Sequence, residues 1–429
     1  MSEEPETKSA ETPKTEPEQD AAAKTEEAAD KTPEEPPKEM RAVVLTGFGG
    51  LKTVKIQKKP EPATLAEGDV LIRVKSCGVN FLDVMARLGL LDSLPKNPFI
   101  MGFECAGVVE KTHENVENFK VGDRVMALPE CGAWAELVAV PQQYVFAIPA
   151  ELSFAEATAF MTSFVIAHIL LFDLGGLAPG KSVLIDSAGG GVGQAVAQLC
   201  KTVKDVVVFG VASKVKHEAI KSSVDHVLER GTDYLSEVRK VSPEGVDLFL
   251  DCVYGEDCNK GYSALKPLGR YVLYGSSGIV TGETKSLFSA ARSWWQVDKI
   301  IPIKLFDENK TLSGLNLRRL LHQQNGSAYI NSTYQKVLAL WRDKQITPLV
   351  DSTFALEDVA EAMQTIHDRK NVGRIVLDLS LEPKPKPATP AKGKAKNNDK
   401  DEKKKEEDEN KENKENKDSP DAEKKENAS

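Results

Sequence analysis

The chain has 429 residues, of which 28% are charged and 41% are hydrophobic, and its formal net charge is −9. This length is sufficient for two or three domains. Most of the negative charge lies in the first 39 residues, which contain 13 acidic and 5 basic side chains. Because no surplus of lysine and arginine exists elsewhere, we do not expect nucleic acid as a partner.

The two terminal segments, 1–39 and 381–429, are predicted to be disordered. The first contains mainly Glu, Pro, Lys, Thr and Ala, and the second contains PKPKPATPAKGKAK followed by DEKKKEEDENKENKENK. Such compositions bury too little apolar surface to offset the entropy lost on ordering. A charged helix is the alternative for the second segment, and its repeated Asn residues disfavour it.

The first ten residues are acidic with no apolar stretch behind them, so we expect no signal peptide. The six cysteines include no CxxC pair, which favours a reducing, cytoplasmic location.

The central part begins with short apolar or alternating runs, from RAVVLTGF at Arg41 to AELVAV at Ala135, separated by Gly, Pro and Asp. These runs predict a β-rich domain. From about Ser153 the pattern changes to helices that alternate with short, wholly apolar strands, which predicts an α/β domain with a doubly wound parallel sheet. The longest apolar run, Ala159–Phe172, falls short of the ~20 residues of a membrane span, so we interpret it as a buried helix.

The most specific motif is SVLIDSAGGGVGQAVAQLC, Ser182–Cys200, in which an apolar strand leads into a glycine-rich turn and then a helix. The spacing of Ala188, Gly190 and Gly193 follows A-x-G-x-x-G, a pattern that lets a pyrophosphate approach backbone N–H groups at a helix N-terminus. A flexible turn is the alternative, and the flanking strand and helix argue against it. The predicted cofactor-binding residues of this turn are Ala188, Gly189, Gly190, Gly191, Val192 and Gly193.

The end of the next strand predicts which dinucleotide binds. An acidic residue about 20 residues beyond the last glycine would grip the ribose of NAD, but VVVFGVASKVK offers Ser213 and Lys214 there. A hydroxyl and a cation suit a 2′-phosphate, so we expect NADPH. The alternative is that Lys214 is an ordinary solvated lysine.

Several motifs together resemble the quinone oxidoreductase (zeta-crystallin-like) branch of the medium-chain dehydrogenase/reductase superfamily. They are SAGGGVGQAVAQLC, CGVNFLDVMARLG from Cys77, GFECAGVV from Gly102 and GDRVMAL from Gly122. Within that branch, MRAVVLTGFGGL, RSWWQVDKIIPIKLFDENK and ALEDVAEAMQTIHDRKNVGRIVLDL are similar to the vesicle amine transport protein 1 homologs, including their homolog-like members. The resemblance covers about residues 40–380.

This resemblance implies a GroES-like β-barrel catalytic domain, 40–163 plus 317–380, with an inserted Rossmann domain, 164–316. It also implies a homo-oligomer, most simply a homodimer joined through the cofactor domains.

No zinc site is expected. Zinc alcohol dehydrogenases of the superfamily place a Cys in a GVC segment and a His in a GHE segment, where this chain has Asn80 and Phe103. Neither side chain replaces a thiolate or an imidazole as a zinc ligand. The structural zinc lobe needs four cysteines, and the segment Arg124–Trp134 has only Cys131.

Without a metal, hydride transfer from NADPH needs an electron-poor acceptor such as a quinone or a conjugated carbonyl compound. Asn80 is the candidate catalytic residue beside the nicotinamide, with a loop-fixing amide as the alternative. Met85 stands where related reductases carry Tyr, and Ile166 replaces a Thr, so two expected hydroxyls are absent. His168, alone in an apolar helix, is interpreted as a core residue.

Three further residues complete the predicted cofactor site. By resemblance, Arg230 adds a second cation for the adenosine phosphate, with a solvated surface arginine as the alternative. Gly275 and Ser276 end a strand at the carboxyl edge of the sheet, where doubly wound folds bind ligands.

Two functions follow from these residues. The first is a zinc-free NADPH-dependent oxidoreductase of quinones or conjugated carbonyls. The second is an NADPH-binding scaffold or sensor with weak or no turnover, peripheral on vesicle or organelle membranes.

Overall fold

The computed structural model describes residues 38–280, 282 and 302–385. The predictions of disorder for 1–39 and 381–429 fall almost wholly outside these residues. At the N-terminal boundary the first strand, β1, already begins at Glu39, one residue before the expected domain start. It pairs with β2 so that Glu39 lies opposite Pro60.

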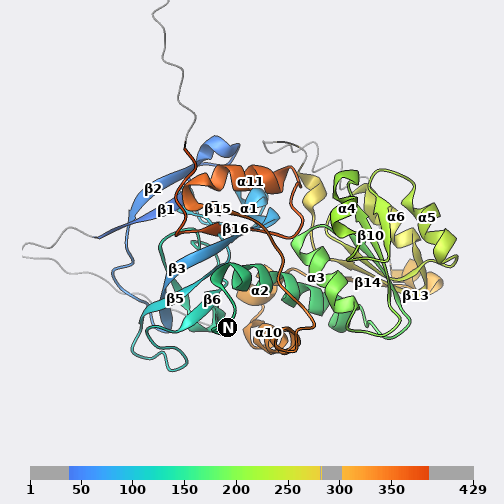
Figure 1. Cartoon of the computed structure of the whole chain (residues 1–429), viewed down its shortest axis with the longest axis horizontal. Coiled ribbons are helices and arrows are strands. Elements are labelled where there is room, and N and C mark those ends of the chain that lie inside the picture. The colour runs from blue at the N-terminus through green and yellow to red at the C-terminus, as the bar shows by residue number, and fades with distance from the viewer. Residues whose placement is uncertain (1–37, 281, 283–301, 386–429) are drawn as a thin grey trace, which may run out of the picture. The chain divides into compact units, whose positions relative to one another are not determined.

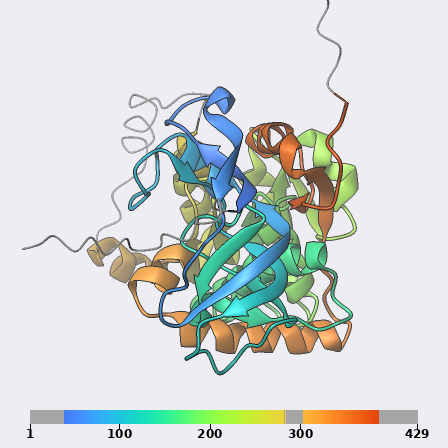
Figure 2. The ribbon, with the colours of Figure 1, turned by 90° about the vertical axis from the view of Figure 1, so that its left-hand side faces the viewer.

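A mostly antiparallel part forms the left half of Figure 1 and faces the viewer in Figure 2. It confirms the β-rich domain expected from the N-terminal pattern and the GroES-like domain that the resemblance implied. In the larger sheet only β15 and β16 run parallel. The larger sheet contains, in spatial order, β15 (Val350–Ala355), β16 (Arg374–Asp378), β3 (Asp69–Val79), β5 (Cys105–Thr112), β6 (Arg124–Ala127) and β8 (Val145–Ala147), with β7 (Leu137–Pro141) also pairing with β3. The smaller sheet contains β2 (Val54–Pro60), β1 (Glu39–Leu45) and β4 (Phe99–Ile100).

A six-stranded parallel sheet forms the right half of Figure 1. Its strand order reverses between β9 and β12, which confirms the doubly wound sheet and creates the crevice where such folds bind ligands. Every residue of β9 and β12 is buried, because helices cover both faces. The strands in spatial order are β11 (His226–Glu229), β10 (Val207–Ala212), β9 (Ser182–Asp186), β12 (Val246–Asp251), β13 (Leu265–Leu273) and β14 (Thr311–Gly314).

The helices surround these sheets. In chain order they are α1 (Phe81–Arg87), α2 (Phe154–His168), α3 (Gly191–Cys200), α4 (His217–Ile220), α5 (Tyr234–Val241), α6 (Glu256–Ser263), α8 (Pro302–Glu308), α9 (Leu317–Gln323), α10 (Ser327–Arg342) and α11 (Val359–His367).

Helix α2 lies between the two sheets (Figure 1). Its start is fixed by a capping box, in which the Glu156 N–H donates to Ser153 Oγ at 3.2 Å and the Ser153 N–H donates to Glu156 Oε2 at 3.0 Å. With the π-helical turn Ile169–Leu174 that follows, it is long and apolar enough to cross a membrane, but 72% of its most apolar window is buried in the fold. The expectation of a buried helix is therefore confirmed.

One hydrophobic core joins the two halves through α2. It contains Phe146 of the antiparallel sheet, Phe160 of α2 and Val183 of the parallel sheet. The domain boundary predicted between residues 163 and 164 falls inside α2, and this helix packs against both halves. The domain limits at 317 and 380 stay predictions.

Candidate active site

The glycine-rich turn lies between β9 and α3. Ser187 adopts a positive φ of 62°, and Gly190 is the N-cap of α3. A Cβ at Gly193 would lie 2.4 Å from the Ser187 carbonyl oxygen, so only glycine lets the helix pack this closely on the turn. Five of the six predicted residues, Gly189 to Gly193, line a cavity of about 1010 Å³.

Ala188 is the exception among the residues of this turn. It is completely buried behind the cavity wall, and its N–H donates to the Val211 carbonyl oxygen at 3.0 Å. A Cβ built at Gly210 would lie 2.8 Å from the Ala188 Cβ. Ala188 therefore holds the turn against β10.

Lys214, the expected cation, does not line the cavity, whereas Lys216, two residues later, does. Strand β10 ends at Ala212 and a 3-10 turn follows, Lys214–Lys216. This turn leaves Lys214 exposed and outside the cavity lining, whereas Lys216 is 9% exposed and lines the cavity. The Lys216 Nζ donates to the Asn371 carbonyl oxygen at 2.6 Å. Ser213 lines the cavity as expected.

Two of the arginines that line this cavity, Arg230 and Arg369, act on the charge of Lys216. Arg230, predicted from the sequence, forms an ion pair with the buried Asp186. Arg369 lies just beyond α11, and its Nη2 donates to the Ser277 carbonyl oxygen at 2.9 Å. Burial lowers the pKa of Lys216 and of Arg369, and in each case the neighbouring cations lower it further. The cavity therefore contains a concentration of positive charge that favours a phosphate group.

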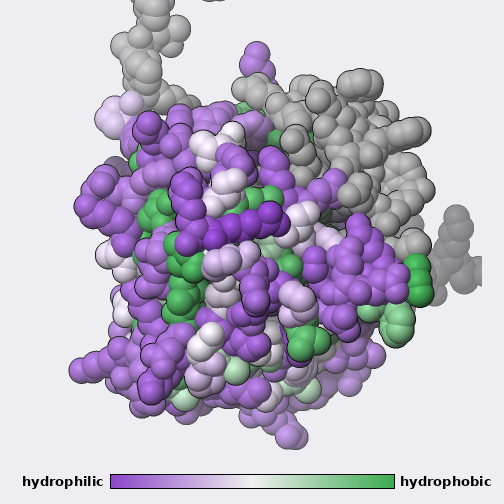
Figure 3. Space-filling model, turned by 90° about the vertical axis from the view of Figure 1, so that its right-hand side faces the viewer, coloured by the Kyte–Doolittle hydropathy of each residue, from purple (hydrophilic) through white to green (hydrophobic). Residues whose placement is uncertain are grey.

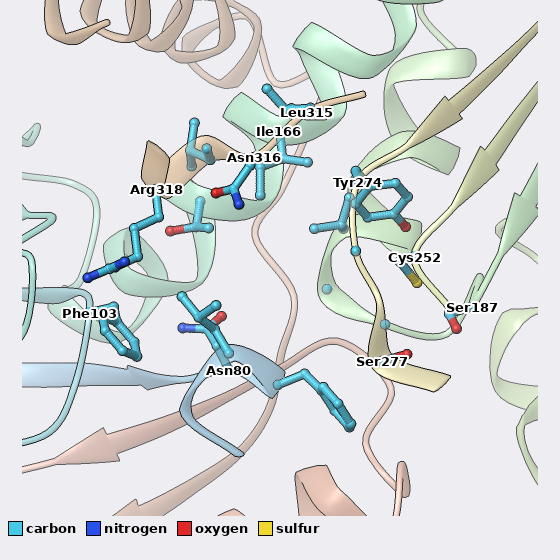
Figure 4. Close-up of a pocket in the computed structure, with 18 of the residues that line it drawn as sticks. Asn80, Phe103, Ile166, Ser187, Cys252, Tyr274, Ser277, Leu315, Asn316 and Arg318 are labelled. Carbon is cyan, nitrogen blue, oxygen red and sulfur yellow. The ribbon is translucent and has the colours of Figure 1, made fainter. Parts of the chain in front are cut away.

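The carboxyl ends of β12 and β13 form the opposite wall. Gly275 and Ser276 line the cavity as predicted, next to Cys252 and Tyr274. Figure 4 shows Cys252, Tyr274, Ser277 and Ser187 facing Asn80 and Phe103 across the cavity. A Cβ at Gly275 would lie 2.9 Å from the Cys252 carbonyl oxygen, so a glycine is needed here. Burial raises the pKa of Cys252 to about 11, which keeps it a neutral thiol.

Asn80 lies at the other end of the cavity, as the N-cap of α1. Its backbone N–H donates to Asp83 Oδ2 at 2.7 Å, and its Nδ2 donates to Glu104 Oε1, also at 2.7 Å. Arg374, the first residue of β16, donates to Asn80 Oδ1 and to Glu104 Oε1. The Thr162 hydroxyl donates to Glu104 Oε2. We call Asn80, Glu104, Thr162 and Arg374 the amide cluster.

Burial has opposite effects on the charged groups around this cluster. It raises the pKa of Asp83 to about 7, although the Asn80 N–H and the Arg374 charge lower it. It lowers the pKa of Arg374 to about 10, against the raising effect of Asp83. Arg374 therefore stays a cation at neutral pH.

Much of the remaining wall around the amide cluster is apolar, but Asn316 and Arg318 also lie there (Figure 4). Met85 and Ile166, where hydroxyls were expected, both line the cavity. Thr162, one turn before Ile166 on α2, instead supplies a hydroxyl. His168 is 8% exposed and lies 3.5 Å from Asp173 through Nδ1, and burial lowers its pKa, in agreement with a core residue. Other apolar lining residues near the cluster are Leu91, Phe103, Leu128 and Leu315.

Sequence reasoning missed Lys216, Arg369, Thr162, Glu104 and Arg374. Two of these residues could have been found from nearby sequence. Glu104 lies in the GFEC motif, and Lys216 lies about one helical turn after the end of β10. The two arginines come from distant sequence positions and had no local signal.

The donor set does not fit zinc. Both polar atoms of the Asn80 amide are hydrogen-bonded within the amide cluster, and the Phe103 ring lies 5.7 Å from the Arg318 guanidinium. Over residues 38–280, 282 and 302–385, no group of three or more His, Cys, Asp and Glu side chains could hold a metal ion. Cys131 is a half-buried free thiol.

Comparisons with known proteins agree with this architecture. Residues 66–150 match the model of the alcohol dehydrogenase GroES-like domain, and residues 222–377 match that of the zinc-binding dehydrogenases. The donor set described above does not fit the zinc named in the second description.

Individual relatives cover most of the chain. The mouse "Synaptic vesicle membrane protein VAT-1 homolog-like" is 54% identical over 347 residues, which cover 80% of this chain and 82% of the mouse protein. The crystal structure of the human VAT-1 homolog-like protein superimposes with a TM-score of 0.71 and 47% identity, covering 80% of this chain and 99% of that one.

A mycobacterial protein, Rv1454c, solved in complex with NADPH, has a TM-score of 0.69 and 25% identity and covers 79% of this chain and 99% of its own. With the two family models and the cleft between the two sheets, these relatives establish that the chain belongs to the VAT-1 homolog-like family of the medium-chain dehydrogenase/reductase superfamily of oxidoreductases.

Proposed function

We propose that this protein is a zinc-independent oxidoreductase that uses NADPH to reduce quinones or conjugated carbonyl compounds. The observation that carries the proposal is one cavity of about 1010 Å³ that is lined by the glycine-rich turn, by Lys216, Arg230 and Arg369, and by the amide cluster. Phosphate binding at the turn and cations and carbonyl binding at the amide cluster would then take place in one cleft. This is what a nucleotide-dependent reductase of small molecules requires.

The residues present fit NADPH. The backbone of Gly189 to Gly193 and the N-terminus of α3 suit the pyrophosphate. Lys216, Arg230 and Arg369 suit the 2′-phosphate, because paired cations in a partly buried site bind such a dianion strongly. The NADPH bound to the mycobacterial relative supports the same cofactor here. When bound, NADPH supplies a hydride.

The amide cluster suits an electron-poor carbonyl substrate. One N–H of Asn80 Nδ2 is used by Glu104, and no other residue of the described part of the chain accepts from its second N–H. That N–H can donate to a carbonyl oxygen on which negative charge develops. The apolar wall, including Phe103 and Leu128, excludes water and so strengthens this interaction.

A turnover assay beside a binding titration tests this function. We expect the purified chain to bind NADPH more tightly than NADH and to consume NADPH when a quinone, an enal or an enone is added. NADPH binding without consumption for any acceptor would contradict the reductase function.

That outcome would favour the second proposal, a nucleotide-binding scaffold or sensor. The specific observation in its favour is that Met85 and Ile166 present only apolar groups to the cavity. In this second proposal the chain is cytoplasmic and peripheral on vesicle or organelle membranes, as the name of the synaptic vesicle relatives supports.

We also propose that two copies of the chain form a homodimer through the cofactor half. Strand β14 is an edge strand of the described sheet, with Leu312 41% exposed, and α8 exposes Ile303 and Phe306 by 57% and 76%. Figure 3 shows hydrophobic residues among a mostly hydrophilic surface at this end of the molecule. Unpaired edges and apolar side chains of this kind favour association.

Sedimentation of the purified chain tests the dimer. We expect twice the monomer mass for the wild type and a shift toward the monomer for Phe306→Glu, because a buried charge opposes association. A wild type that sediments as a monomer would contradict the proposal.

A further inference from the structure

Asn80 makes more side-chain contacts within the amide cluster than it would need if it only held a loop in place. Arg374 is separated from Asn80 by 294 positions in the sequence, yet its Nη1 donates to Asn80 Oδ1 while its Nη2 donates to Glu104. Because a guanidinium only donates and a carboxylate only accepts, these partners fix which end of the amide is oxygen and which is nitrogen. Asn80 is therefore held with its Nδ2 between Glu104 and the cavity.

We propose that Arg374 is a positioning residue that polarises the Asn80 amide, so that its positive charge acts on the substrate carbonyl oxygen through Asn80. The inference rests on the proposed reductase function and names how its site stabilises charge without a metal. A cation that donates to an amide oxygen draws electron density from the amide nitrogen, which makes the second N–H a stronger donor. The low exposure of the Arg374 side chain, 8%, limits screening of this effect by water, while the ion pair with Glu104 offsets part of the Arg374 charge.

The reduction of a conjugated carbonyl would have two steps. With NADPH bound, the hydride that it supplies would add to the substrate β-carbon, leaving NADP⁺, and the electron pair of the C=C bond would shift so that negative charge develops on the carbonyl oxygen. The Asn80 N–H donates to this oxygen, and the interaction is stronger for the enolate than for the neutral carbonyl. The α-carbon afterwards takes a proton from water, which regenerates the carbonyl group.

Two glycines let the cluster assemble. A Cβ at Gly78 would lie 1.8 Å from Glu104 Oε1, so the missing side chain provides the space for the carboxylate beside β3. Gly373, with φ of +104°, donates its N–H to the Gly189 carbonyl oxygen at 3.0 Å. This contact sets the start of β16 against the glycine-rich turn, so that Arg374 reaches Asn80 from the cofactor side of the cavity.

A set of variants tests the proposal. Because removal of Arg374 alone would leave Glu104 as an unpaired buried charge, the informative variant is the neutral pair Glu104→Gln/Arg374→Gln. It is compared with Asn80→Ala, with the triple variant, and with Arg41→Gln/Glu136→Gln. The last pair is a control for the loss of an ion pair outside the cavity lining; it is more exposed than Glu104 and Arg374, and Arg41 also pairs with Glu357.

Turnover and an infrared spectrum are the two readouts. We expect the neutral pair to lower kcat about 10- to 100-fold, part of the effect of losing an oxyanion donor, with little change in the KM of the acceptor or in NADPH affinity. The triple variant should have the same kcat as Asn80→Ala, because Arg374 acts only through Asn80. In the complex of the protein with NADP⁺ and benzylacetone, the carbonyl stretching frequency should be lowered by the wild type, less by the neutral pair and not by Asn80→Ala.

These outcomes separate the inference from the proposed function. Losses in kcat that multiply in the triple variant, or a carbonyl frequency equal in the wild type and the neutral pair, would overturn the role of Arg374. An altered frequency in a wild type that consumes no NADPH would uphold the cluster and reject the reductase. The control pair should leave both readouts unchanged.

Discussion

Alanine at Gly193 is expected to destabilise the fold, whereas alanine at Gly190 is expected to leave the fold intact and weaken NADPH binding. The Cβ of alanine at 193 would lie 2.4 Å from the Ser187 carbonyl oxygen and 2.8 Å from the Ala188 Cα. Both atoms belong to the backbone of the turn, which must therefore move away from α3. Forced backbone shifts of this kind cost about 3 kcal/mol, and the displaced turn also loses its affinity for the cofactor.

Gly190 has a different surrounding. Only the Ser187 carbonyl oxygen, at 3.4 Å, lies within 4 Å of a Cβ built there, and the residue lines the cavity. Its φ of −76° is open to any residue. The added methyl group therefore meets the space that the pyrophosphate approaches, and we expect a loss of about tenfold or more in NADPH affinity.

Thermal unfolding and titration calorimetry of the two variants measure these effects. Gly193→Ala should lower Tm by several degrees, as expected for about 3 kcal/mol in a chain of this size. Gly190→Ala should unfold at the wild-type temperature. Equal NADPH affinity in Gly190→Ala and the wild type would contradict the assignment of this turn to the pyrophosphate.

The features that the sequence predicted well are local ones. The buried strand β9 and the turn that follows it are encoded within about 20 consecutive residues, where strand, glycine spacing and helix agree. The change from alternating β runs to alternating strands and helices near Ser153 likewise predicted two kinds of sheet, and the structure contains both.

The features that the sequence did not predict arise where distant segments meet. Arg374 and Glu104 are 270 positions apart, and Arg369 reaches the cofactor half from the end of α11. Periodicity and spacing describe neighbours in the chain and carry no information on such contacts. Sequence reasoning also missed Lys216, because its place in the cavity lining depends on the direction in which one 3-10 turn leaves β10.

The second large effect concerns the choice of cofactor. Lys216→Met keeps the aliphatic stem, whose Cδ would lie 2.9 Å from a Cβ at Gly189, and removes only the charge and the hydrogen bond of Nζ. A hydrogen bond to a charged group is worth about 1.5–3 kcal/mol, so NADPH affinity should fall about 10- to 100-fold. NADH has no 2′-phosphate, and its affinity should fall much less.

The ratio of the two affinities is the informative quantity, because Lys216 also holds the Asn371 carbonyl oxygen at 2.6 Å. Any loosening of that contact weakens both cofactors by a common factor, which cancels in the ratio. Lys214→Met is the matched control. It removes the same charge two residues away, and the Lys214 side chain lies outside the cavity lining. The ratio of NADPH to NADH affinity in this variant should therefore equal that of the wild type. Fluorescence titration measures both affinities. Equal losses of NADPH and NADH affinity in Lys216→Met, or a changed ratio in Lys214→Met alone, would show that Lys216, Arg230 and Arg369 do not form the phosphate site. The preference for NADPH would then have to come from elsewhere in the cleft.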